Sequence, residues 1–322
     1  MTNPPNTTGR PSKFISWCRL LRVPNLFTVP GDPIVGFVLA GAVAAPQDPA
    51  TWAHLWWPPV VCALLLYAAG LLANDYFDLA EDRRDRPERP LPAGEVRPRV
   101  AIVVAILAIL AAVGLAACVN SVCAATAAAL GGCALAYDGR LKRIPVIGPL
   151  AMGACRGLSL LLGAAARAPE TPAHFLILLP AVCLGLYIAA ITLIAAGETR
   201  RRALPVIRWG PPAAMIALLV AVSLPSGGFL MFLPAYGHED LWLVTSTLMI
   251  LAAGATFSAA ERLRGCPAPV TVQRSIGQLI RNLLLVHAAV AGVMGFPYWL
   301  VAVALLAAWP ASAILARRFY AS

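Results

Sequence analysis

The chain has 322 residues, of which 60% are hydrophobic and only 12% are charged, with a net charge of +10. Soluble domains carry about 25% charged residues, so the composition excludes a soluble protein and predicts an all-α, polytopic membrane protein. The sequence has no basic stretch interleaved with aromatic residues, which argues against nucleic acid as a partner. The eight cysteines form no Cys-x-x-Cys pair and are predicted to be small buried side chains.

Ten apolar segments are long enough to cross a lipid bilayer, which takes about 20 residues as a helix. Residues 1–13 precede them as a polar tail that is predicted to be disordered, and residues 14–322 are predicted to form one integral membrane domain. The stretch Ser226–Tyr236 is apolar but too short to cross, so it is predicted to be re-entrant or interfacial. The expected spans are 26–45, 57–80, 100–118, 121–138, 146–166, 174–196, 206–224, 240–260, 274–293 and 297–316.

The first expected span contains an acidic residue, Asp32, in the sequence Gly31-Asp32-Pro33. A carboxylate within hydrocarbon is costly, so such a residue is a functional candidate. Asp32 is predicted either to satisfy the backbone at a helix break or to act in a cavity as a base or an acceptor contact. Asn25, at the start of the span, is predicted either to cap a helix or to orient the acceptor.

The second expected span ends in a cluster of acidic residues. Six of the fifteen acidic residues of the chain lie between Asp75 and Glu88. At about 100° per residue, Asp75, Asp78 and Asp82 would lie within roughly 60° of one another on one helix face. Three carboxylates on one face repel unless a cation neutralises them. Mg²⁺ prefers oxygen ligands of this kind, to which Asn74 would add an amide oxygen, and it leaves positions for substrate phosphates.

Basic residues near this cluster give it two explanations. In the first, the carboxylates belong only to a solvated helix end and pair weakly with the neighbouring arginines Arg83, Arg84 and Arg86. In the second, Arg89, Lys142 and Arg143 neutralise a diphosphate that departs with the help of Mg²⁺. An apolar cavity in the membrane behind such a site would hold a long tail, so the substrate would be an isoprenyl diphosphate. The sequence contains no G-x-x-x-x-G-K-[ST] nucleotide loop.

The charges of the loops predict the orientation in the membrane. With a cytoplasmic N-terminus, the loops on the cytoplasmic side hold clusters of Lys and Arg, whereas those on the other side hold a single basic residue, Arg167. An even number of spans then places Arg317 and Arg318 in the cytoplasm as well. The polar exits of the second, fourth and sixth spans would all face the cytoplasm, in a bacterial-type cytoplasmic membrane.

At this point the sequence resembles a known family. The pattern Asn74-Asp75-x-x-Asp78-x-x-x-Asp82, followed by Arg89-Pro90-Leu91-Pro92-x-Gly94, resembles the signature of the UbiA superfamily of intramembrane prenyltransferases. Tyr137-x-x-x-x-Lys142-Arg143 is similar to the tyrosine-and-lysine element of that family, and Arg22-Val23-Pro24-Asn25 to its N-terminal Arg-Pro-x-Asn region. The resemblance covers residues 14–293. It implies a nine-helix α-barrel that opens to the cytoplasm, Mg²⁺-dependent prenyl transfer, and a tenth span that is an addition.

The sequence departs from the family pattern after the sixth expected span. The family has a second D-x-x-x-D motif there, of which this chain retains only Glu198, followed by Arg200, Arg201 and Arg202. Glu198 is the remaining candidate metal ligand on this side, and Arg200 is predicted to take over part of the neutralisation of the diphosphate. In the fifth span, Arg156 is predicted to contact the diphosphate or the acceptor, or else to be a paired arginine.

These residues predict an enzyme that ionises an allylic isoprenyl diphosphate and transfers the prenyl group to a small aromatic or lipid-like acceptor within the bilayer. The predicted catalytic residues are Asp75, Asp78, Asp82 and Lys142, and His287 of the ninth span is predicted to be structural. A terpene cyclase, in which the double bonds of the substrate itself trap the cation, remains an alternative, as does a transporter. The acceptor, the prenyl chain length and the oligomeric state stay open.

Overall fold

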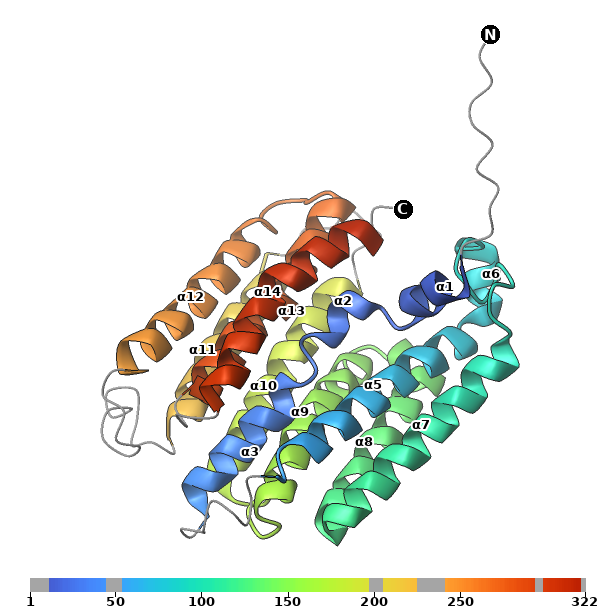
Figure 1. Ribbon diagram of the computed structural model, residues 1–322. Helices are drawn as coiled ribbons and strands as arrows, with labels where there is room; N and C mark the ends of the chain where they lie inside the picture. Colours follow the sequence, from blue (N-terminus) through green and yellow to red (C-terminus); the bar gives the residue numbers. More distant parts are fainter. Residues whose placement is uncertain (1–11, 45–53, 197–204, 225–240, 293–297, 320–322) are drawn as a thin grey trace.

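The computed structural model describes residues 12–44, 54–196, 205–224, 241–292 and 298–319, which form helices joined by loops (Figure 1). Eight helices are long and apolar enough to cross a membrane. Two shorter apolar helices, Ile207–Ser223 and Trp299–Leu315, occupy the positions of the seventh and tenth expected spans. The predicted all-α, multi-span architecture is therefore confirmed, while Ser226–Tyr236 lies outside the described residues.

The first expected span is a broken helix. A short helix, α1 (Lys13–Leu20), precedes it, and the span itself consists of α2 (Val23–Leu26) and α3 (Gly31–Val43), separated by turn residues 27–30. Pro30 and Pro33 have no main-chain N–H to donate, so a continuous helix would lose hydrogen bonds here. Because the helix is broken here, α3 starts inside the bundle, and Asp32, its second residue, is buried there.

The remaining helices follow the expected spans closely, and proline often marks where they begin. Pro98 is the first residue of its helix, a position where the missing N–H costs nothing. The helices are α5 (Trp57–Phe77), α6 (Leu79–Asp85), α7 (Pro98–Val119), α8 (Ser121–Gly139), η1 (Leu141–Arg143), α9 (Ile147–Arg167), α10 (Phe175–Ala195), η2 (Ile207–Trp209), α11 (Gly210–Ser223), α12 (Leu241–Glu261), α13 (Pro269–Gly292) and α14 (Tyr298–Phe319).

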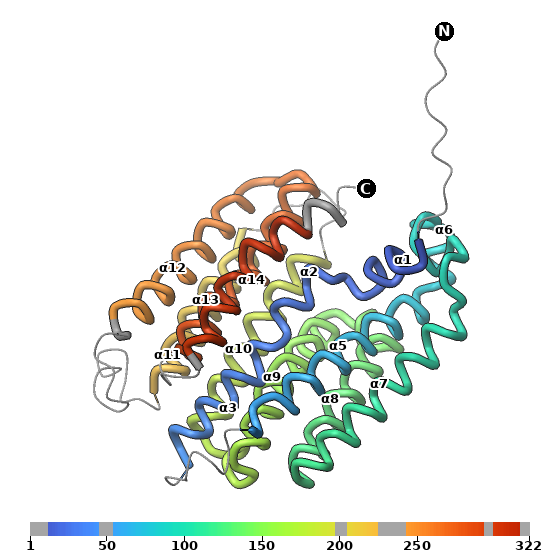
Figure 2. The backbone as a smooth tube through the Cα atoms, in the orientation of Figure 1, coloured from blue at the N-terminus to red at the C-terminus, as the bar shows by residue number. Residues whose placement is uncertain are grey.

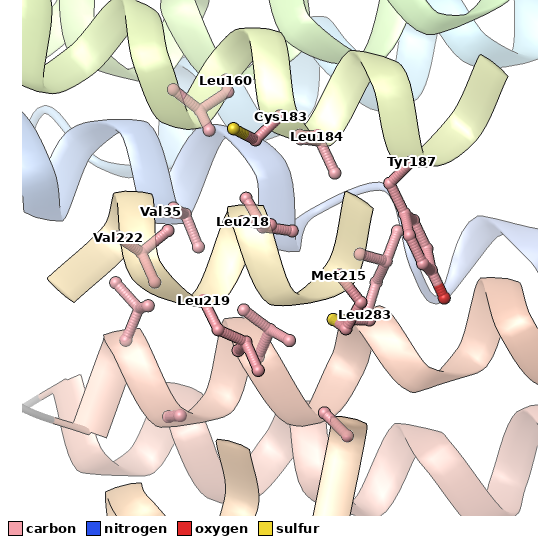
Figure 3. Close-up of a cluster of buried hydrophobic side chains, with 14 of the residues drawn as sticks. Val35, Leu160, Cys183, Leu184, Tyr187, Met215, Leu218, Leu219, Val222 and Leu283 are labelled. Atoms are coloured by element: carbon pink, nitrogen blue, oxygen red, sulfur yellow. The ribbon is translucent and has the colours of Figure 1, made fainter. Parts of the chain in front are cut away.

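α3 and α9 pack against each other in the middle of the bundle, between two groups of helices (Figures 1 and 2). One cluster of buried apolar side chains joins them to α5, α7 and α8, and a larger cluster joins them to α10–α14. Figure 3 shows part of the larger cluster, in which Leu218 and Val222 of α11 lie between Leu184 of α10 and Leu283 of α13. The structure thus has two packed halves that share a central helix pair.

Burial distinguishes central helices from peripheral ones. Every residue from Gly31 to Ala40 of α3 is buried. In α7, by contrast, the buried residues are four alanines on one face, and large aliphatic side chains such as Leu107 and Leu110 are exposed, as expected of a helix that faces lipid. The prediction that the cysteines are buried holds for Cys62, Cys123 and Cys183; Cys18, Cys133 and Cys155 are partly buried, and Cys118 and Cys266 are exposed.

Glycines bring the backbones of α3 and α9 into direct contact. A methyl group added at Gly36 would lie 1.8 Å from the Leu160 carbonyl oxygen, and one added at Gly163 would lie 1.8 Å from the Pro33 carbonyl oxygen. No side chain fits at either position. The contact fixes the separation of the two helices that carry Asp32 and Arg156.

Reporter fusions should place both ends of the chain on the same side of the membrane. The carboxyl end of α14 lies at the same end of the bundle as α1 and α6 (Figures 1 and 2). A fluorescent-protein fusion at the C-terminus or after Glu88 should therefore be bright in a bacterial host. A phosphatase fusion after Glu170, in the loop that follows α9, should be active instead. A C-terminal fusion that behaves like the fusion after Glu170 would contradict this orientation.

Candidate functional site

The acidic segment at the end of α5 is bent rather than continuous. α5 ends at Phe77, and α6 begins at Leu79, with Asp78 between them at φ −88° and ψ 0°. The expectation that Asp75, Asp78 and Asp82 share one face of a single helix is therefore wrong. The chain still brings them together, because the segment after α6 turns back and carries a basic side chain between the two helices.

That basic side chain belongs to Arg89. Its Nη1 lies 2.9 and 2.8 Å from the two carboxylate oxygens of Asp82 and 3.9 Å from Oδ1 of Asp75. Arg22, between α1 and α2, approaches the same Oδ1 of Asp75 with its Nη2 at 3.3 Å. The Asp75 and Asp82 side chains are only 8% and 7% exposed, whereas the Arg22 side chain is 33% exposed and the Arg89 side chain 26%. The cations therefore lie over the carboxylates.

A third cation reaches the site from η1, the short helix that follows α8. Lys142 Nζ lies 2.6 Å from Oδ1 of Asp78 and donates a hydrogen bond to Oδ1 of Asn74 at 3.1 Å. Lys142 is positioned by η1, which turns the chain between α8 and α9. Each predicted catalytic carboxylate is thus paired with a basic side chain from a different segment of the chain.

Arg22 has an unusual backbone conformation. Its φ of 43° and ψ of 52° lie in the left-handed region, which a side chain other than glycine occupies at a cost of about 1–2 kcal/mol. The conformation turns the chain from α1 into α2 while the guanidinium contacts Asp75. Such a conformation is typical of sites whose surroundings hold a side chain in one place.

Two further residues join this site without a clear signal in the sequence. Tyr67 of α5 is hydrogen-bonded to the Asn25 side chain and interacts electrostatically with Arg22 and Arg156. Asp138 of α8 is buried and interacts electrostatically with Lys142, Asp78 and other charges of the site. Tyr67 lies in the same apolar helix as the acidic motif, eight residues before Asp75, and belongs to no motif of its own. Asp138 could have been found because it follows Tyr137 in the sequence. The Tyr137 side chain is half-buried and interacts electrostatically with Asp138.

A second polar cluster lies deeper in the bundle. Arg156 of α9 meets Asp32 of α3 through two contacts, Nε to Oδ2 at 2.8 Å and Nη2 to Oδ1 at 3.0 Å. Nη2 of Arg156 also donates to the Thr28 carbonyl oxygen at 3.2 Å. His287 of α13 places Nε2 3.2 Å from Oδ1 of Asp32. The paired-arginine expectation for Arg156 is confirmed, and Asp32 is held by side chains rather than by a backbone break.

Other predicted residues stand apart from both clusters. Arg143 is exposed and makes no ion pair within the described part of the chain. Glu198 and Arg200 lie outside the described residues. Within residues 54–196, no ion pair joins the acidic cluster to the arginines that would make it merely a solvated helix end, Arg83, Arg84 and Arg86. The carboxylates pair with residues from distant parts of the sequence instead.

The donor set at the end of α5 suits a hard cation. Asp75, Asp78, Asp82 and Asn74 offer carboxylate and amide oxygens of the kind that Mg²⁺ binds. As the side chains lie, no group of three or more His, Cys, Asp or Glu residues among those described is arranged to hold a metal ion. Arg22, Arg89 and Lys142 contact the carboxylate oxygens in this arrangement. The site fits Mg²⁺ provided that these cations move to another anion.

Comparison with known proteins gives relatives named digeranylgeranylglyceryl phosphate synthase. The chain is 37% identical over 155 residues to a digeranylgeranylglyceryl phosphate synthase of Methanopyrus kandleri, with 48% of this chain and 52% of the relative covered. It is 30% identical over 165 residues to the enzyme of that name from Methanothrix thermoacetophila, covering 51% of this chain and 59% of the relative. The chain thus spans little more than half the length of these curated relatives.

Comparison of structures gives the same fold. The structure of a UbiA homolog from Archaeoglobus fulgidus bound to DMAPP and Mg²⁺ matches with a TM-score of 0.57 and 19% identity, over 87% of this chain and 99% of that one. The likeness confirms the UbiA-like membrane fold. The UbiA prenyltransferase family model matches residues 34–266, which include the acidic segment, Lys142 and Arg156. With most of its length matched by that model, this multi-pass membrane protein belongs to the UbiA prenyltransferase family.

Proposed function

We propose that this enzyme transfers a prenyl group from an isoprenyl diphosphate to a hydroxyl group of a lipid acceptor, with Mg²⁺ as its cofactor. One observation carries the proposal: three carboxylates and three cations pair with one another at one end of the helix bundle. A diphosphate with a divalent cation is the ligand that matches both sets of charges at once. The relatives named digeranylgeranylglyceryl phosphate synthases support a lipid acceptor over an aromatic one.

The ion pairs provide the groups that hold the departing diphosphate. Arg22, Arg89 and Lys142 are more exposed than Asp75 and Asp82, so they can turn from the carboxylates to phosphate oxygens by changing rotamers. Guanidinium groups bind phosphate oxygens through two parallel hydrogen bonds. When bound, Mg²⁺ supplies charge neutralisation at the oxygens where negative charge develops. Asn74, Asp75, Asp78 and Asp82 are its proposed ligands.

The leaving diphosphate carries the electron pair of the bond to the first prenyl carbon. Positive charge then develops on the allylic carbon, and a hydroxyl oxygen of the acceptor forms the new bond there and loses its proton. Tyr67 and Tyr137 flank the site, and an aromatic face stabilises a nearby cation. Asn25 is a proposed acceptor contact, Arg143 and Arg200 are proposed to complete the neutralisation of the diphosphate, and Glu198 is proposed as a further Mg²⁺ ligand.

The charge asymmetry of the loops supports an active site that faces the cytoplasm. The acidic end of α5, α6 and the α8–η1 loop with Lys142 all belong to the expected cytoplasmic side. A soluble diphosphate head would enter from that side, while its apolar tail and the lipid acceptor stay within the bundle and the bilayer.

The purified enzyme in detergent should release diphosphate when it is given Mg²⁺, geranylgeranyl diphosphate and a geranylgeranylglyceryl phosphate acceptor. Mass spectrometry should find a product that equals the acceptor plus one prenyl group minus one hydrogen. EDTA should abolish the product and added Mg²⁺ should restore it, because the carboxylates cannot hold a diphosphate without a cation. A cyclised hydrocarbon formed without acceptor, or transport of the diphosphate in proteoliposomes without its cleavage, would overturn the proposal.

A further inference from the structure

The buried cluster of Asp32, Arg156 and His287 makes no ion pair with Asp75, Asp78 or Asp82 among the described residues. Its three members come from α3, α9 and α13 and are 0%, 8% and 2% exposed. Ionisable groups in membrane-spanning helices are costly, so they are retained where they do something. Tyr67 interacts electrostatically with both Arg22 and Arg156, so the cluster lies next to the diphosphate site on its interior side.

The hydrogen-bond donors of Arg156 are only partly used. Nε and Nη2 face Asp32, and Nη2 also donates to Thr28, whereas Nη1 has no hydrogen-bond partner among the described residues. The side chain of Arg156 is 10% exposed, while that of Asp32 is fully buried. Arg156 is therefore the member of the cluster that can contact a ligand, and Asp32 acts only through it.

A second polar group lies on the same helix as Arg156. Ser159 is three residues further along α9, so the two side chains lie on neighbouring positions of one helix face. Ser159 is 5% exposed, and its hydroxyl has no hydrogen-bond partner among the described residues. A buried hydroxyl without a partner normally costs about 1–3 kcal/mol. An unpartnered buried hydroxyl three residues from an arginine with an unused nitrogen, on one helix face, indicates a place for a polar group of a ligand.

His287 is built to hold Asp32 rather than to exchange protons with a substrate. Its Nε2 faces Asp32, and its Nδ1 is buried against Gly31, where an added methyl group would lie only 1.8 Å away. Glycine at position 31 is thus what makes room for the ring. Because Gly31 packs against Nδ1, only Nε2 of His287 is directed at a polar partner. His287 therefore orients the Asp32 carboxylate, which in turn orients Arg156.

The charge of this cluster decides what it can bind. The carboxylate of Asp32 already neutralises the guanidinium of Arg156, so the exposed part of the cluster offers hydrogen bonds without a net positive charge. A carboxylate ligand would lose its hydration and gain no uncompensated cation in return, whereas a hydroxyl loses little. We infer that Arg156 and Ser159 bind the hydroxyl of the acceptor, and that Asp32, held by His287, is the positioning residue that makes this site select uncharged over anionic groups.

This inference rests on the proposed function for the identity of the acceptor, but its first test needs no activity. In detergent, benzoate should raise the thermal midpoint of Asp32→Asn and leave that of the wild type unchanged, because the substitution exposes the charge of Arg156. Benzyl alcohol, of similar shape and no charge, should affect the two proteins equally. The double variant Asp32→Asn/Arg156→Gln has a neutral pair and should lose the response to benzoate. Equal effects of benzoate on wild type and Asp32→Asn would overturn the inference.

Kinetics with the acceptor give the second test. Asp32→Asn should raise the KM for the hydroxyl acceptor at least tenfold and leave the KM for the prenyl diphosphate unchanged. Ser159→Ala removes a hydroxyl that has no hydrogen-bond partner among the described residues, so this variant should fold normally and raise the acceptor KM several-fold. Should Asp32→Asn not fold, Ser159→Ala decides: an unchanged acceptor KM would overturn the inference. Suppose that the wild type shows no transferase activity, but that benzoate stabilises Asp32→Asn and not the wild type. This result would overturn the proposed function and would still support the inference that Asp32 makes the site select uncharged over anionic groups.

Discussion

Replacing Asp78 with alanine should abolish the release of diphosphate while the protein stays folded. Asp78 lies at the junction of α5 and α6, its side chain is 19% exposed, and its carboxylate is 2.6 Å from Lys142 Nζ. The change removes a proposed metal ligand and leaves Lys142 without its counter-charge, but it removes no packed side chain. We expect the rate to fall more than tenfold, which corresponds to over about 1.4 kcal/mol of activation free energy. The measurement is diphosphate release with Mg²⁺, alongside thermal unfolding in detergent.

Asp85→Ala is the matched control for this prediction. Asp85 belongs to the same acidic cluster and ends α6, but it is exposed and makes no ion pair within the described residues. Its removal changes the net charge of the segment as much as the Asp78 substitution does. Activity near the wild-type level is expected for Asp85→Ala. If Asp78→Ala kept more than about a tenth of the wild-type rate, Asp78 would have no role in metal binding.

Alanine at Gly36 should destabilise the protein more than any exposed substitution. The new methyl group would lie 1.8 Å from the Leu160 carbonyl oxygen, so α3 and α9 would have to separate. Overpacking of this kind costs typically about 1–3 kcal/mol, and here the obstacle is backbone, which cannot change rotamer. Gly163→Ala should behave in the same way, because it faces the Pro33 carbonyl oxygen at the same distance. Thermal unfolding of the purified variants measures both effects.

Gly132→Ala and Gly114→Ala provide the controls for the glycine series. Both positions lie within helices, α8 and α7, and a methyl group at either would meet nothing within 4 Å. Since alanine is favoured over glycine in a helix interior by about 1 kcal/mol, these variants should be as stable as the wild type or slightly more so. Four variants with the same loss of stability would show that glycine matters here for reasons other than the contact between α3 and α9.

The spans were predictable because length and hydropathy alone decide which segments cross a bilayer. The interruptions were not. The break at residues 27–30 and the bend at Asp78 depend on local backbone geometry, to which a count of apolar residues is blind. The bend overturned the argument from a single helix face, although the three carboxylates still meet. Two of them, Asp75 and Asp82, meet because Arg89 contacts both. No helical period encodes such a contact between side chains.

The site itself was half predictable. The acidic residues, Arg22, Arg89 and Lys142 stand in short recognisable patterns, and the structure brings all of them together. Which cation pairs with which carboxylate was beyond the sequence, since neighbouring arginines such as Arg83 were equally good candidates. The pairing of Asp32 with His287 could not be seen at all, because it joins the first and ninth spans. Polar residues isolated in apolar helices signal that partners exist without identifying them.

The ion pair between Asp32 and Arg156 also sets an order of events during synthesis. The two residues are 124 positions apart, so at about 5–20 residues per second Asp32 enters the bilayer some 6–25 s before Arg156 is made. Until then the first span carries an unpartnered acid, which costs about 2.5–3.5 kcal/mol in a helix centre. α3, buried on every side in the finished enzyme, must therefore wait beside the translocon or as a weakly inserted segment until α9 arrives. The first span to emerge is among the last to reach its final environment.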